Sequence, residues 1–266
     1  MNPIVNLIIR TFIETIYLTG IIIVAGFILG FLRNSTIANL QRSFGMKAVM
    51  ITALIGTPIH ELSHALIAII FGHRIVDIKL LQNPDKTGTL GYVNHTYNPS
   101  NVYQRIGNFF IGVAPIFGGI TVIMALLKLT TPVAFDNFMM TLKQNLSINI
   151  LNSDSVHGVL ISNIAVIKSI FALSNFKNPY FYLFLLVAIC ISSHISLSKA
   201  DVNGAFVGLV SIFMLVLVVN VVGLSKYISG ALMIKYNVLM TGFLSVAIVF
   251  SCITFLISLI FRVLKS

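Results

Sequence analysis

Long uninterrupted blocks of apolar residues constrain this chain more than any other feature. The first block runs over residues 16–32, and similar blocks recur to the end of the sequence. A helix that spans a bilayer needs roughly 20 predominantly apolar residues. Hydrophobic residues make up 57% of the chain and charged residues 9%, whereas soluble proteins carry about 25% charged residues. The chain is therefore predicted to be an integral membrane protein.

The blocks predict an all-α polytopic fold that forms one membrane domain over residues 1–266. The first block is longer than the apolar core of a cleavable signal, which is about 7–15 residues, and no small-residue cleavage site follows it. We interpret it as a retained first span. Five or six spans are expected in all, at about 16–32, 48–71, 106–129, 180–196, 205–224 and 238–259.

Basic residues flank these blocks, and the net charge is +10. They are scattered and form no cluster interleaved with aromatic residues, so nucleic acid is not an expected partner. Under the positive-inside rule, Arg33, Arg42 and Lys47 place the end of the first span in the cytoplasm, and Arg262 and Lys265 do the same for the C-terminus. Six spans would put these two ends on opposite sides, so a charge cue or the span count must be wrong. We expect a multi-pass protein of the bacterial cell membrane, with lipid around it.

Two regions between the blocks break the pattern. Residues 75–80 partly alternate apolar and polar side chains, turn residues follow, and 89–93 resemble a return strand. We predict a small strand pair there, with an exposed loop as the alternative. Segments 135–146 and 156–173 are apolar enough for interfacial or re-entrant helices, and 156–173 could be a further span. The two cysteines, Cys190 and Cys252, lie in apolar blocks and are interpreted as packing residues.

The second block contains the motif His60-Glu61-Leu62-Ser63-His64, which has the pattern H-E-x-x-H. On a helix, positions i and i+4 lie on one face, so both imidazoles can bind one Zn²⁺ ion while Glu61 accepts a proton from water. Charged residues within spans are costly and usually functional. Thr57-Pro58, just before the motif, indicates either a helix start or a proline kink inside a longer helix.

A catalytic zinc ion needs a third protein ligand. Asp201 is the preferred candidate, because it lies at a junction between two late spans, where Asn203-Gly204 indicates a turn. His194 is the rival, because it lies seven residues earlier, about two helical turns away, and could bind the metal or orient a ligand.

The H-E-x-x-H motif is followed by the strand-like segment, then by a span marked by Gly and Pro (107–119), and then by the late aspartate, Asp201. This order of features resembles the site-2 protease family of intramembrane zinc metalloproteases. The resemblance covers about 48–224. It implies that His60, His64 and Asp201 hold zinc and that Glu61 is the base. In that family the aspartate lies in an Asn-Pro-Asp-Gly type motif, whereas the segment here, 199–204, lacks the proline, which suggests a divergent branch.

These observations predict a zinc-dependent endopeptidase that cleaves a membrane-associated protein or peptide. Two alternatives remain. One is a zinc-containing membrane protein that does not cleave peptides, such as an immunity or partner-binding protein, although an intact Glu61 argues against it. The other is an ion transporter that uses His60, Glu61 and Asp201, although the sequence shows no internal repeat of the kind transporters carry.

Overall fold

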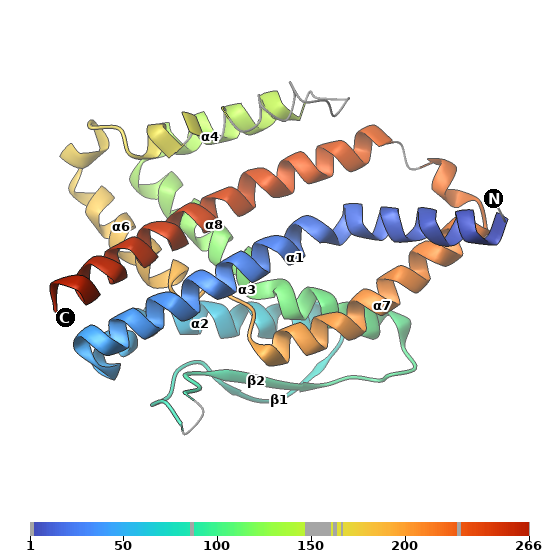
Figure 1. Cartoon of the computed structure of the whole chain (residues 1–266), viewed down its shortest axis with the longest axis horizontal. Coiled ribbons are helices and arrows are strands. Elements are labelled where there is room, and N and C mark those ends of the chain that lie inside the picture. Colours follow the sequence, from blue (N-terminus) through green and yellow to red (C-terminus); the bar gives the residue numbers. More distant parts are fainter. Residues whose placement is uncertain are drawn as a thin grey trace.

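Helices form most of the chain in the computed structural model, which describes residues 3–85, 88–146, 161, 164–165, 167–227 and 230–265 (Figure 1). Five of these helices are long and apolar enough to cross a membrane, and a shorter apolar helix, α6, stands where the fourth span was predicted. The helices are α1 (Pro3–Phe44), α2 (Met46–Ile70), α3 (Val102–Thr130), α4 (Pro132–Asn145), α6 (Pro179–Ser192), α7 (Lys199–Val221) and α8 (Gly230–Leu264). The predicted all-α polytopic fold with a small strand pair is confirmed.

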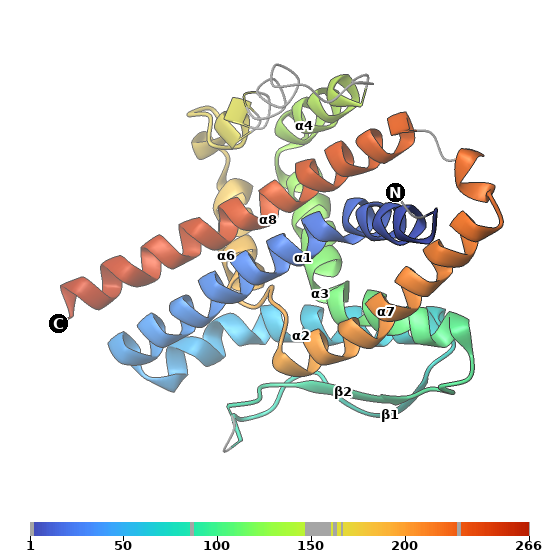
Figure 2. The same ribbon diagram turned by 45° about the vertical axis from the view of Figure 1, so that its right-hand side comes forward.

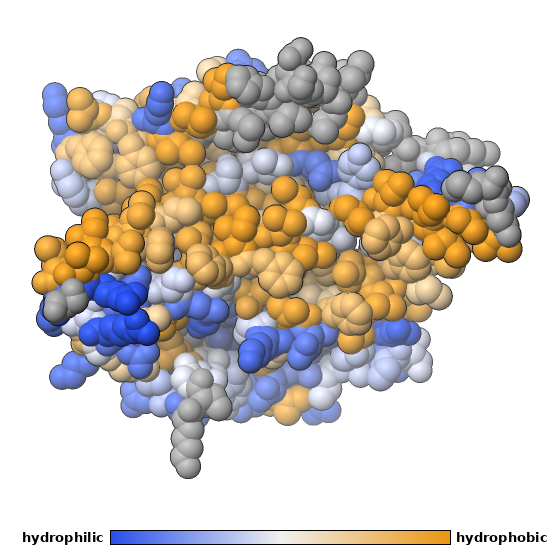
Figure 3. Space-filling view, viewed as in Figure 1, coloured by the Kyte–Doolittle hydropathy of each residue, from blue (hydrophilic) through white to orange (hydrophobic). Residues whose placement is uncertain are grey.

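Apolar side chains lie both inside and outside this bundle. The core brings together α3, α6 and α8 through residues such as Ile116, Phe184 and Phe250, all of which are fully buried. Large apolar side chains also point outward along all five long helices, for example Phe31 on α1 and Phe206 on α7. In Figure 3 the apolar surface forms a broad band, with a hydrophilic zone beneath it over the strand pair. Such a band is what lipid contact requires.

The C-terminal ends of α1 and α8 lie side by side. Asn39 donates a hydrogen bond to Ser258 (3.2 Å) and accepts one from Arg262 (3.3 Å), and Lys265 donates to the carbonyl of Ser43 (2.6 Å). The two basic ends therefore share one side, and the two charge cues agree. Six complete crossings would leave five between these two ends and put them on opposite sides of the membrane. A count of six therefore does not agree with ends that share one side.

Helix α2 lies along one side of the bundle. In both Figure 1 and Figure 2, α2 lies on the side of the strand pair, and in Figure 2 it runs crosswise to α3. The motif on α2 therefore lies near the hydrophilic edge of the apolar band.

The strand pair is an antiparallel hairpin of β1 (Arg74–Lys79) and β2 (Tyr92–Thr96), with a bulge between Ile75 and Asp77. The exposed-loop alternative is thus wrong. The first strand lies where it was predicted, but the second begins three residues later than expected. The reason lies in the connection, where the backbone N–H of Gln82 donates to the carbonyl of Leu90 (2.7 Å) and closes a loop before the ladder starts.

The region between α3 and α6 agrees with the sequence where it is described. Helix α4 covers the predicted segment 135–146 up to Asn145 and begins earlier, at Pro132, because a proline suits the first turn of a helix. Of the predicted segment 156–173 the structure describes residues 161, 164–165 and 167–173, and those up to 170 are helical; residues 156–160, 162–163 and 166 lie outside the described residues.

Candidate metal centre

The H-E-x-x-H motif lies in the middle of α2, which is continuous from Met46 to Ile70. Pro58 is therefore inside a long helix, and the alternative of a helix start at Thr57 is wrong. Proline has no N–H to donate, so the carbonyl of Leu54 lacks its usual helical partner one turn before the motif. His60 and His64 follow on one face, and their rings are 4.9 Å apart.

Asp201 reaches the same place from the first turn of α7. Ser198 caps this helix: its hydroxyl accepts the N–H of Asp201 (3.1 Å), and its own N–H donates to Oδ2 of Asp201 (2.7 Å). The predicted turn at Asn203-Gly204 is wrong, because both residues are helical. The carboxylate points inward because this reciprocal capping box fixes it.

A glycine on α3 lets α7 approach the site. A β-carbon at Gly112 would lie 2.6 Å from the carbonyl oxygen of Asp201 and 2.8 Å from the β-carbon of Ala205. Only a residue without a side chain fits there, because real β-carbons essentially never come within 3.0 Å of another heavy atom. The small residue therefore sets the distance between Asp201 and the helices that carry the rest of the site.

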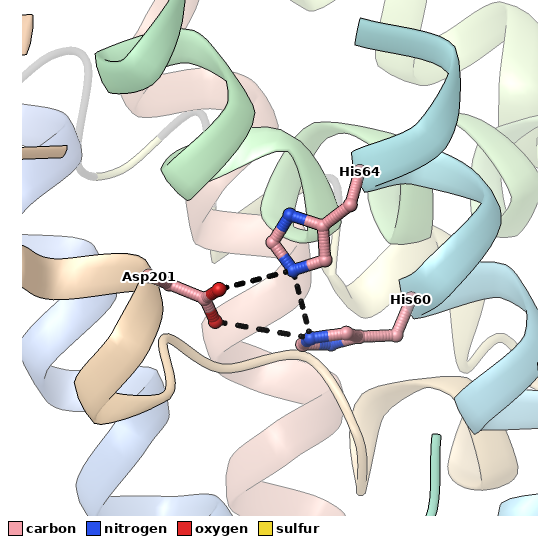
Figure 4. Close-up of side chains that lie close together, drawn as sticks. All are labelled: His60, His64 and Asp201. Atoms are coloured by element: carbon pink, nitrogen blue, oxygen red, sulfur yellow. Dashed lines mark hydrogen bonds and ion pairs between the residues drawn. The ribbon is translucent and has the colours of Figure 1, made fainter. Parts of the chain in front are cut away.

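Three potential ligand atoms converge from α2 and α7 (Figure 4). Nε2 of His64 lies 3.2 Å from Nε2 of His60 and 3.2 Å from Oδ1 of Asp201, and Nε2 of His60 lies 3.9 Å from Oδ2. All three ligand atoms lie within 4.8 Å of one another. Two ligands of a tetrahedral zinc ion with bonds of about 2.0–2.1 Å lie roughly 3.3 Å apart. The donor set and its spacing therefore fit zinc.

Backbone carbonyls orient both imidazoles. Nδ1 of His60 lies 3.0 Å from the carbonyl of His194, and Nδ1 of His64 lies 2.7 Å from the carbonyl of Ile111. A carbonyl only accepts, so each Nδ1 carries the proton and each Nε2 presents its lone pair to the other and to Asp201. Lone pairs so close repel unless they share a cation, and such outer contacts are typical of metal-binding histidines.

His194 supports the site without joining the ligand set. It follows α6 and is not helical, so the predicted shared face with Asp201 is wrong. Its Nε2 lies 3.1 Å from the hydroxyl of Thr52 and its Nδ1 lies 3.4 Å from that of Thr57. Thr52 already donates to Val49, so it accepts from Nε2, and Thr57 donates to Nδ1. Both ring nitrogens are therefore used, and the geometry favours Asp201 as the third ligand.

Glu61 faces a cavity of about 710 Å³, which also contains the three ligand residues. The hairpin forms one wall through 88–95, and the start of α7 forms another. The hairpin comes close because Gly91 has no side chain: a β-carbon there would lie 2.9 Å from Cγ of Glu61 and from Cγ2 of Thr57. Glu61 thus lies between the cluster of potential ligand atoms and the hairpin, beside a space large enough for a segment of peptide.

The structure also brings together residues that the sequence did not pair. Nδ1 of His73 lies 3.0 Å from Nδ1 of His95, and Nε2 of His73 donates to the carbonyl of Gln104 (2.8 Å). His73 is buried. Burial, and then the neighbouring His73, lower the pKa of His95. This pair ties the end of α2 to the hairpin, which fixes the wall of the cavity.

Arg33 is the second such residue. The sequence indicated only a charge that flanks a span, but the side chain lines the cavity together with Glu61 and Asp201. One signal was available, because Arg33 continues a helical stripe of inward-facing residues on α1 (Thr15, Thr19, Ile22, Gly26, Leu29 and Thr36).

Comparison with known proteins finds no matching family model, curated protein or solved structure. The resemblance to site-2 proteases therefore rests on the residues and the geometry of this chain alone.

Proposed function

We propose that this protein is a zinc-dependent endopeptidase that hydrolyses a peptide bond of a membrane-associated protein or peptide. The observation that carries the proposal is the convergence of His60, His64 and Asp201 beside Glu61 at the wall of a polar cavity. Two imidazoles and a carboxylate leave a fourth position for water or substrate, as catalytic zinc sites require.

Each residue then has a defined task. His60, His64 and Asp201 would hold the metal, and the carbonyls of His194 and Ile111 fix the two rings. Zinc, when bound, would supply Lewis acidity to the scissile carbonyl and to the attacking water. The carboxylate of Glu61 takes a proton from that water and passes it to the nitrogen of the leaving amine.

The hairpin suggests how substrate is presented. A helical segment hides its amides in hydrogen bonds, so it must become extended before it is cleaved. In a two-stranded sheet each strand has one edge without a ladder partner, and an extended peptide can add to such an edge. Residues 92–95 of β2 line the cavity, so a peptide on that edge would pass Glu61. Because the site lies near the hydrophilic edge of the apolar band, the cleaved bond would lie close to the membrane surface.

The Glu61→Gln variant tests this function. It keeps the shape of the side chain but removes the proton acceptor. In detergent, with casein and a synthetic membrane-spanning peptide as probes, we expect cleavage to fall by about two orders of magnitude or more while about one zinc ion per chain remains. The matched control is Glu14→Gln, which makes the same change at the other glutamate of the chain, on α1 and away from the residues that line the cavity. Cleavage by Glu61→Gln at the wild-type rate would exclude the mechanism, and wild-type protein without zinc would exclude the site.

A further inference from the structure

Arg33 projects from α1 into the cavity of the candidate metal centre with little to bind. Its Nε is buried and has no hydrogen-bond partner among the described residues. Among the described residues, the rest of the guanidinium donates only to the amide oxygen of Asn34, at a long 3.4 Å. A guanidinium has five N–H donors, and leaving a buried donor unsatisfied is costly. A side chain placed in this way is suited to receive an acceptor that enters from the cavity.

Neither carboxylate of the site, Asp201 or Glu61, is the direct acceptor for the guanidinium of Arg33. Asp201 and Glu61 both attract the charge of Arg33, yet Arg33 makes no ion pair within 4.0 Å with any described residue. Asp201 is engaged elsewhere, because its oxygens face the two histidines and the N–H of Ser198. Arg33 is therefore attracted to both carboxylates at a distance but forms an ion pair with neither.

The balance of charge in the cavity favours an anion. The charged side chains that line it are Arg33, Lys199, Glu61 and Asp201, so the cations and the anions cancel. A bound zinc ion would leave the cavity net positive. The planar fork of a guanidinium matches a carboxylate through two parallel hydrogen bonds, which a lysine cannot copy. Because the Arg33 side chain lines the cavity, a peptide inside the cavity reaches its guanidinium more readily than a lipid headgroup at the outer surface does.

We propose that Arg33 binds a carboxylate of the substrate close to the scissile bond, so that the enzyme selects peptides with an acidic residue next to the cleavage site. The inference rests on the proposed function, because it assumes that peptide enters the cavity at the metal. Arg33 would then determine specificity, while the proton transfers remain with Glu61.

Two peptide hydroxamates test this assignment. They have the same sequence except for Glu or Gln beside the hydroxamate, which anchors both probes at zinc. Their dissociation constants are measured by calorimetry on the zinc-loaded full chain in neutral detergent. We expect wild type to prefer the Glu probe by about tenfold or more, because a charge-assisted hydrogen bond distinguishes the two. Arg33→Gln should bind both equally, and Arg33→Lys should keep only part of the preference.

Arg42→Gln is the matched control, because it removes the same charge from an exposed position on the same helix. It should keep the wild-type preference. Zinc content and helical circular dichroism show whether Arg33→Gln is folded, and Arg33→Lys decides the question if it is not.

Equal binding of the two probes by wild type, or an undiminished preference in Arg33→Gln or Arg33→Lys, would overturn the role of Arg33 and leave the metal centre intact. Loss of the preference when phosphatidylglycerol is added would assign Arg33 to a lipid phosphate instead. Failure of both probes to bind zinc-loaded wild type would overturn the inference together with the proposed function.

Discussion

Asp201 has two tasks in this structure, and a pair of substitutions separates them. Its carboxylate is a candidate zinc ligand, and the same group completes the capping box of α7. Asp201→Asn keeps an oxygen that can accept the N–H of Ser198 but removes the charge. Ser198→Ala removes the hydroxyl from the cap and leaves the carboxylate. We expect Asp201→Asn to lose zinc and keep α7, and Ser198→Ala to keep zinc and weaken α7.

The magnitudes follow from the contacts. Structural zinc sites contribute about 10–16 kcal/mol, so one of three protein ligands accounts for roughly 3 kcal/mol or more, and zinc affinity should fall at least about a hundredfold in Asp201→Asn. The capping hydroxyl contributes about 1 kcal/mol, which Ser198→Ala should remove from the free energy of unfolding. For His194→Ala we expect a loss of about tenfold in zinc affinity, because the carbonyl that orients His60 belongs to the backbone and remains.

Zinc affinity is measured by competition with a chelator of known strength, and stability by thermal unfolding with and without zinc. Bound zinc at a hundred times its dissociation constant stabilises a fold by about 2.7 kcal/mol, so wild type should melt at a higher temperature with zinc, and Asp201→Asn should not. If His194→Ala lost more affinity than Asp201→Asn, the ligand assignment would be reversed. If neither variant lost affinity, the third ligand would lie elsewhere.

Three other predictions follow from the same geometry. The double variant His60→Ala/His64→Ala should lose nearly all zinc in elemental analysis, and full retention would exclude the site. In Gly91→Ala the new methyl group would lie 2.9 Å from Cγ of Glu61, so the hairpin must shift and cleavage should fall by about tenfold to a hundredfold at unchanged zinc content, whereas wild-type cleavage would show that the hairpin wall is not part of the site. His95 should titrate below about 6.5 in an NMR experiment, because burial lowers its pKa. Its contribution to the stability of the fold is then present above that pH and is lost as the pH falls. A titration midpoint above about 6.5 would contradict this prediction.

The fold was largely predictable because lipid leaves few solutions. A long apolar block must be a helix, since only helices and closed barrels satisfy every backbone group in a bilayer. Hydropathy does not record direction, however. The block that forms α2 has the composition of a span, but the helix runs crosswise to α3 along one side of the bundle. That the two basic ends share one side follows only from the hydrogen bonds of Asn39 and Lys265 to their neighbours.

The site was predictable as far as its spacing is local. His60, Glu61 and His64 lie within five residues, so helical geometry alone places them together. The sequence argument for Asp201 relied on a turn at residues 203–204, but these residues are helical. The pattern that does place Asp201 is the capping box Ser198-x-x-Asp201, which is present in the sequence. The orientation of the histidines was not predictable, because it depends on the carbonyls of residues 111 and 194, which belong to other helices and loops.

Arg33 shows why a charge beside a span has two meanings. As a flanking charge it orients the helix in the membrane, and it needs no partner because water surrounds it. As a group on the packed face it must find an acceptor within the protein or bind one from outside. The spacing decides between these, because Arg33 lies four residues after the buried Leu29 and three before the buried Thr36, on the stripe that faces the bundle. Topology would require only a positive charge at this end of α1, which Arg42 already supplies, so the inward position of Arg33 is better explained by an anion that enters the cavity.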